Sequence, residues 1–72
     1  MNASEIIIRL KKYIAMKQPV AYQEIKYIPV CLVYWFDRNQ SEWKYSVELV
    51  DPTHKNTTVR ANVEKVEFIE GE

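Results

Sequence analysis

The chain of 72 residues has only one cysteine, one histidine and one glycine. A single cysteine excludes a disulfide within the chain, and one Cys with one His cannot supply the four ligands of a structural zinc site. A domain of this size buries only about 60% of its unfolded surface, and small domains often depend on disulfides, metals or partner chains. Of these three sources of stability, a partner subunit is therefore the one that the sequence does not exclude.

Net charge is also lacking, because ten basic residues balance ten acidic ones. A neutral chain has no overall field that attracts nucleic acid or a membrane surface. The charges are unevenly placed, however. Residues 1–36 carry five Lys or Arg and two acids, whereas residues 37–72 carry five Lys or Arg and eight acids. The N-terminal half is therefore mildly basic and the C-terminal half acidic.

Long hydrophobic runs are absent. The longest, residues 27–36, has ten residues, about half of what a membrane span requires. The run Ile6–Ile8 is interrupted at once by Arg9, which does not fit a secretory signal. We therefore expect a cytoplasmic protein without a membrane partner.

The first pattern that is present predicts an amphipathic helix over residues 3–17. Asn2 or Ser4 fits the N-cap, and Asn2 followed by Glu5 has the spacing of a capping box. Pro19 ends the helix. The apolar residues recur at helical spacing and form one stripe: Ile6, Ile7, Leu10, Tyr13 and Ile14.

A short strand over residues 20–22 and a long strand over residues 25–37 follow, joined by a tight turn at Gln23-Glu24. Pro29 cannot donate a ladder hydrogen bond, so it predicts an edge, a bulge or a bend in the long strand. Both faces of residues 27–36 are apolar. This pattern predicts a strand covered on two sides, one of them by the helix.

Strict alternation over residues 43–50 predicts a third, half-buried strand. Trp43, Tyr45, Val47 and Leu49 should share one face, and the intervening Lys44, Ser46 and Glu48 the other. The remaining elements are a polar loop at 37–42, a turn at 51–56, a strand at 57–63, a short turn at Glu64-Lys65, a final strand at 66–69 and a frayed tail at 70–72. Together these predict a single α+β domain, with the helix packed on a bent antiparallel sheet of four or five strands over residues 20–69.

The segment 58–69 resembles the end of a Src homology 3-like small barrel, where a short strand, one tight helical turn and a closing strand occur in this order. Further features of the chain are the N-terminal helix, Pro19-Val20-x-Tyr22, Tyr45-x-Val47-Glu48-Leu49-x-Asp51 and Val63-Glu64-Lys65-Val66-Glu67. In these features the whole layout is similar to small uncharacterised proteins of Gram-positive bacteria and of their phages or mobile elements. The resemblance implies a barrel-like fold, but it carries no known activity and no binding residue.

Three sets of residues are candidates for chemical function. Cys31 with His54 and Asp51 has the residue types of a nucleophile, a base and an orienting acid, but a cysteine in an apolar strand favours a core role. His54 and Asp51 alone are too few to select a metal. The acids Glu64, Glu67, Glu70 and Glu72 are typical of a solvated face. We therefore expect no enzyme, no metal and no cofactor.

Aromatic residues give the strongest functional signal. Consecutive strand residues point to opposite faces, so a single core cannot take all of these rings. Either the helix covers the others, or they meet a partner or solvent. We therefore predict a non-catalytic interaction module that binds a protein partner, with a homodimer and barrel closure as competing ways to cover the apolar surface. The rings flank one hairpin loop and are Tyr34, Trp35, Phe36, Trp43 and Tyr45.

The basic part of the helix supports an alternative function. Lysine and arginine on one helix face can follow a phosphate backbone. The alternative is therefore a nucleic-acid-binding small barrel that adds Trp35 or Trp43 to this helix. Its basic residues are Arg9, Lys11, Lys12 and Lys17.

Overall fold

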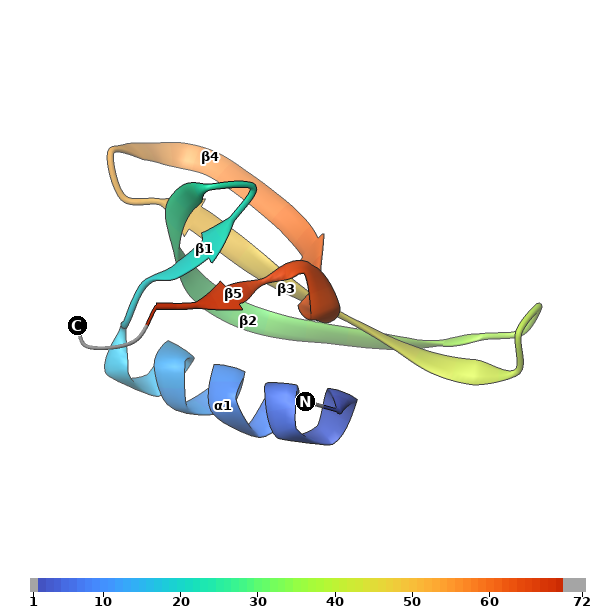
Figure 1. Ribbon diagram of the computed structural model, residues 1–72. Coiled ribbons are helices and arrows are strands. Elements are labelled where there is room, and N and C mark those ends of the chain that lie inside the picture. The colour runs from blue at the N-terminus through green and yellow to red at the C-terminus, as the bar shows by residue number, and fades with distance from the viewer. Residues whose placement is uncertain (1, 70–72) are drawn as a thin grey trace.

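The computed structural model describes residues 2–69, with the side chains of residues 55 and 56 left aside; the predicted frayed tail lies outside the described residues. One helix lies along an open antiparallel sheet, which makes the fold α+β (Figure 1). The elements in chain order are α1 (Ala3–Met16), β1 (Val20–Tyr22), β2 (Ile25–Asp37), β3 (Glu42–Asp51), β4 (His54–Asn62), a 3₁₀ turn η1 (Val63–Lys65) and β5 (Glu67–Phe68).

Helix α1 begins where the capping pattern predicts. The Oδ1 atom of Asn2 accepts a hydrogen bond of 2.9 Å from the backbone N–H of Glu5. The helix ends at Met16, one residue earlier than predicted, because Lys17 adopts a left-handed conformation with φ of 56°. The N–H of Gln18 then bonds back to the carbonyl of Tyr13 at 3.0 Å, a common way to end a helix. No helix of the described residues is long and apolar enough to span a membrane.

Strand β2 joins two parts of one sheet, whose strand order is β4-β3-β2-β1-β5. Its first residues, Ile25 to Tyr27, pair with β1, and from Ile28 onward it pairs with β3. The register shifts between Pro29 and Cys31, which confirms the irregularity that Pro29 predicts. A bulge of this kind bends the strand and increases its twist. The bend turns β1 and β5 back over α1 (Figure 1).

The hairpin between β1 and β2 forms without glycine. Tyr22 pairs with Ile25, so Gln23 and Glu24 are the two turn residues, and their φ angles are 51° and 66°. Two left-handed residues are the signature of the turn type that matches strand twist, and asparagine followed by glycine fits it best. Side chains with a Cβ atom adopt this conformation only at an energetic cost.

We expect the double substitution Gln23→Asn with Glu24→Gly to stabilise the protein by about 1 kcal/mol, since both new residues tolerate positive φ. Urea denaturation would measure the gain as a higher midpoint at unchanged slope. Glu24→Ala is the matched control. It removes the same charge but keeps a Cβ atom, so it should give no gain. An equal gain from Glu24→Ala would contradict the turn conformation.

The core lies between one stripe of α1 and the concave side of the sheet. Ile6, Leu10 and Tyr13 of the helix are buried, as the stripe predicts, whereas Ile7 and Ile14 are half-buried. Both Val47 and Leu49 are fully buried, which confirms the predicted register of β3 at its C-terminal half. The buried apolar residues that meet the helix stripe are Val20, Tyr27, Val47, Leu49, Ala61, Val63 and Val66.

Ser46 departs from the prediction of a solvent-facing side chain, since it is only 4% exposed. It pairs with Val33 on one side and Asn62 on the other, so neighbouring strands flank it completely. Its hydroxyl oxygen has no hydrogen-bond partner in the described part of the chain. Alternation alone predicts the face of a residue but not the crowding on that face.

Several boundaries near the C-terminus also differ from prediction. Strand β4 begins at His54 instead of residue 57, because the side chain of Asp51 accepts the N–H of Thr53 at 2.8 Å and tightens the turn. Val63 begins a 3₁₀ turn instead of ending the strand, and Asn62 caps that turn through a 2.9 Å bond from the N–H of Glu64. Strand β5 is correspondingly short.

The largest correction concerns the cover predicted over both faces of residues 27–36. Tyr34, Trp35 and Phe36 are 65%, 47% and 47% exposed. The reason is the length of the strands: β4 pairs with β3 only as far as Ser46, and the 14-residue α1 is only about 21 Å long. The β2–β3 hairpin therefore projects beyond the N-terminal end of α1 (Figure 1). We call residues 34–45 the arm.

Candidate functional site

Four aromatic rings line one face of the arm. Tyr34 pairs with Tyr45, and Phe36 pairs with Trp43, so all four side chains point the same way. The ring centroids of Tyr45 and Tyr34 are 6.2 Å apart, those of Tyr34 and Trp43 5.7 Å, and those of Trp43 and Phe36 5.6 Å. These are favourable spacings for aromatic pairs. The four rings therefore form one continuous row, which we call the aromatic ladder.

The ladder is largely open to solvent. Trp43 is 53% exposed and stands between the exposed rings of Tyr34 and Phe36, whereas Tyr45 at the base of the arm is half-buried. Trp35, the fifth aromatic residue of the predicted set, lies opposite Lys44 and points to the other face. Adjacent exposed rings of this kind mark interaction sites in soluble proteins.

A groove of about 460 Å³ runs between the ladder and the N-terminal half of α1. Its size is within the range of small-ligand and peptide sites, and such sites combine apolar walls with a few polar groups. Three of the lining rings belong to the aromatic set that the sequence predicts. Ile8 does not belong to any predicted set, since it is 68% exposed and lies off the predicted stripe. The lining residues are Ser4, Ile7, Ile8, Lys11, Leu32, Tyr34, Trp43 and Tyr45.

A second hollow of about 330 Å³ lies on the other side of Trp43 and is more polar. Lys44 and Glu42 lie on its wall, joined by an ion pair of 2.8 Å. The hydrogen bond to Glu42 raises the pKa of Lys44. The exposed Trp43 ring is thus bordered by an apolar groove on one side and charged groups on the other, an arrangement typical of protein interfaces.

The basic residues of the helix do not form one face. The guanidinium carbon of Arg9 lies 5.0 Å from the centre of the Phe68 ring, on the side of β5. Lys11 is instead on the wall of the groove. Two residues that are two positions apart on a helix are separated by about 200°. Lys12 and Lys17 are exposed, but Lys17 lies past the end of α1 in the left-handed cap.

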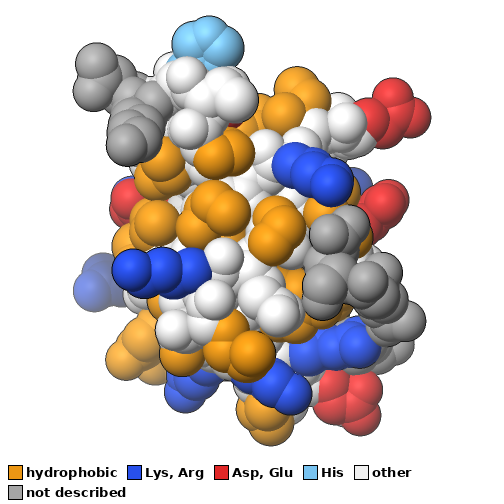
Figure 2. Space-filling model, turned by 90° about the vertical axis from the view of Figure 1, so that its left-hand side faces the viewer, with side chains coloured by type: hydrophobic (Ala, Val, Ile, Leu, Met, Phe, Trp, Pro, Cys, Tyr) orange, Lys and Arg blue, Asp and Glu red, His pale blue; other side chains and the backbone are white. Residues whose placement is uncertain are grey.

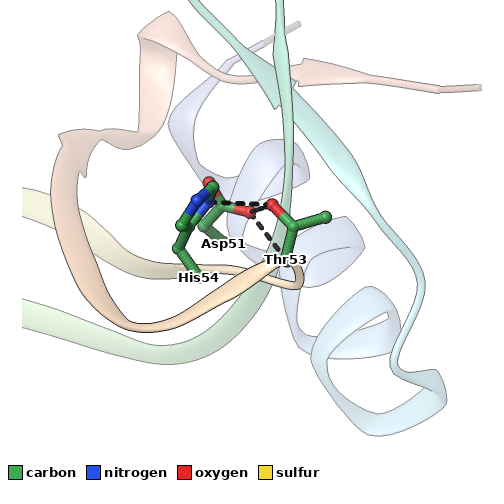
Figure 3. A network of polar contacts seen from close by, with 3 residues as sticks. All are labelled: Asp51, Thr53 and His54. Carbon is green, nitrogen blue, oxygen red and sulfur yellow. Dashed lines mark hydrogen bonds and ion pairs between the residues drawn. The ribbon is translucent and has the colours of Figure 1, made fainter.

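Of Cys31, His54 and Asp51, the fold brings together only His54 and Asp51. Thr53 donates its hydroxyl to Oδ1 of Asp51 at 2.7 Å, and Nδ1 of His54 lies 3.0 Å from that hydroxyl and 3.4 Å from Oδ2 of Asp51 (Figure 3). The bonds from Thr53 lower the pKa of Asp51. This exposed network tightens the β3–β4 turn. Among the described residues, no group of three or more His, Cys, Asp or Glu is placed to hold a metal ion.

Cys31 lies elsewhere on the sheet and outside the core that was predicted for it. It pairs with Glu48, three residues along β3 from Asp51, or about 10 Å. Burial and the nearby Glu48 carboxylate raise the pKa of its thiol, which opposes formation of the nucleophilic thiolate. Glu48 itself accepts a 3.1 Å bond from Arg60. Glu64 and Glu67 of the acidic set are exposed, and the other two acids lie outside the described residues.

The end of the molecule remote from the tip of the arm has a different surface. Hydrophobic side chains gather over the middle of that face, but polar atoms separate them and Lys and Arg flank them (Figure 2). Exposed apolar side chains that polar atoms separate from one another are ordinary on a protein surface. The ladder differs because its rings contact one another in a continuous row beside a groove.

Comparisons with models of protein families, with curated proteins and with solved structures found no match to this chain. The site is therefore defined by its geometry: the aromatic ladder, the groove beside it, and Lys11 on the groove wall.

Proposed function

We propose that the protein is a non-catalytic interaction module that binds an apolar segment of a protein partner along the aromatic ladder. The observation that carries this proposal is the exposure of three adjacent rings, Tyr34, Phe36 and Trp43, beside the groove that α1 borders. Tryptophan and tyrosine supply most of the binding energy in many protein interfaces. A face built from such rings suits recognition of side chains better than chemical catalysis.

The ladder is also organised before any partner arrives. Contacts between the rings of Tyr34, Trp43 and Phe36 hold them in place on paired strands. Binding to a preorganised surface loses less side-chain entropy than binding to a flexible one. Lys11 on the groove wall adds one positive group to the apolar lining. The partner segment that fits best is therefore apolar and carries a carboxylate that reaches Lys11.

We also propose that the sheet belongs to the Src homology 3-like class of small barrels. Support comes from β2, which serves both parts of the sheet, and from the 3₁₀ turn that joins β4 to β5. Small barrels bind many unrelated partners through exposed aromatic rings, so the fold alone does not identify the ligand. The sequence resemblance to small proteins of Gram-positive bacteria and their mobile elements supports the same class of fold.

Nucleic-acid binding has less support from the geometry. The cations of α1 diverge, because Arg9 contacts Phe68 while Lys11 borders the groove. The net charge of zero provides no field that would draw a polyanion. A protein segment is accordingly the preferred ligand of the ladder.

Selection from a random displayed-peptide library tests the proposed function. We expect the parent protein to select apolar peptides with an acidic residue, and Trp43→Ala to lose their binding by roughly thirtyfold. Trp35→Ala is the matched control, because it removes the same exposed side chain from the opposite face of the arm. Selected peptides that bind both variants equally well, or a failure to select any, would contradict the proposal.

A further inference from the structure

We infer that the aromatic ladder binds the aromatic ladder of a second copy of this chain, so that two arms pack face to face in a twofold dimer. The inference rests on the proposed function, because it names an occupant for the same surface. It is carried by two observations: the surface area of the molecule and the strand pairing of the arm.

The molecule has more surface than a compact monomer of its mass. Its accessible area is 5363 Å², whereas a folded chain of 8.6 kDa is expected to expose about 4,700 Å². The radius of gyration is 12.3 Å, against about 11 Å for a compact domain of this length. This excess area is of the same order as the area that each partner contributes to a standard interface, which is about 800 Å². The projecting arm accounts for the elongated shape (Figure 1).

The arm has no third strand. Among the described residues, 34–37 and 42–45 pair only with each other, because β1 pairs with β2 no further along than Tyr27 and β4 pairs with β3 only as far as Ser46. A two-stranded ribbon is marginal in water unless something packs on its apolar face. Helix α1 borders the groove but does not fill it. A second layer on the ladder would provide the missing cover.

A second copy has the right chemistry for that layer. A twofold axis places identical surfaces against each other, so rings meet rings. When two arms pack antiparallel, the tip of one lies over the base of the other. The tip carries two acids, Asp37 and Glu42, and two bases, Arg38 and Lys44, so it has no net charge that would repel Lys11 at the base of the partner arm. Because the net charge is zero, the two chains do not repel each other.

Light scattering across a concentration series, with the untagged full chain, tests this inference. We expect the parent to approach the mass of two chains at high micromolar concentration. Trp43→Ala should weaken the dimer by roughly thirtyfold, and Trp35→Ala should leave it unchanged. Ile8→Glu, at an exposed position on the groove wall, is a second variant that should also weaken it. Circular dichroism confirms that each variant is folded.

The outcomes separate this inference from the proposed function. A parent that stays strictly monomeric at high micromolar concentration overturns the dimer. If that monomer still binds selected peptides through Trp43, the proposed function stands without it. A dimer that Trp35→Ala disrupts and Trp43→Ala does not would also overturn the inference, because the other face of the arm would then form the interface.

Discussion

Replacing Leu49 by Asp is expected to leave the protein unfolded at neutral pH and 25 °C. Leu49 is fully buried in the middle of β3, so the substitution removes its apolar contacts and places a carboxylate in their stead. Loss of a buried leucine costs about 2–5 kcal/mol, and burial of an unpaired charge adds to this. A domain of 72 residues has only about 4–11 kcal/mol of stability to lose.

Val50→Asp is the control for this prediction. Val50 is the next residue along β3, points to the other face and is half-buried, so its substitution should cost only about 1 kcal/mol. Far-ultraviolet circular dichroism and urea denaturation would compare the two variants. A folded Leu49→Asp protein beside an unfolded Val50→Asp protein would mean that the register of β3 is shifted by one residue.

Truncating Leu10 to alanine is expected to lower the free energy of unfolding by about 2–5 kcal/mol. Leu10 lies at the centre of the helix stripe with no exposed surface, so a cavity would remain between α1 and the sheet. Ile8→Ala is the matched control. Ile8 is 68% exposed on the same helix, and its truncation should change stability by about 0.5 kcal/mol or less.

Thermal and chemical denaturation would measure both helix variants. If Leu10→Ala and the parent have the same melting temperature, α1 does not belong to the core and the packing of the fold is wrong. If Ile8→Ala is as damaging as Leu10→Ala, Ile8 supports the fold and the groove wall is not free for a partner.

Much of the fold follows from patterns that are local in sequence. Asn2 and Glu5 predict the start of α1, and the observed bond between them shows why: a side-chain oxygen satisfies a free N–H of the first turn. The alternation in β3 predicts that Val47 and Leu49 are buried together, and they are. Pro29 predicts an irregular strand, since it lacks the N–H that a regular ladder requires.

The candidate site was less accessible to sequence reasoning because it depends on where elements end relative to one another. Whether Tyr34 and Phe36 are covered is decided by the short reach of β4 and α1, which no local pattern of the arm encodes. The division of the rings, with Trp35 apart from the ladder, follows from alternation once the register is known. Ile8 had a signal, as an isoleucine off the buried stripe, but its place beside the ladder is a tertiary contact.

The two tryptophans provide the most direct test of the ladder as the interaction surface. Their indole N–H groups give separate signals in a nitrogen-15 correlation spectrum, and single substitutions assign them. The peptide from the library selection is added to protein that is dilute enough to be monomeric, so that the ladder is free. The Trp43 signal should then shift, and the Trp35 signal should stay in place. A shift of Trp35 alone, or of neither signal while the peptide is bound, would show that the partner binds elsewhere.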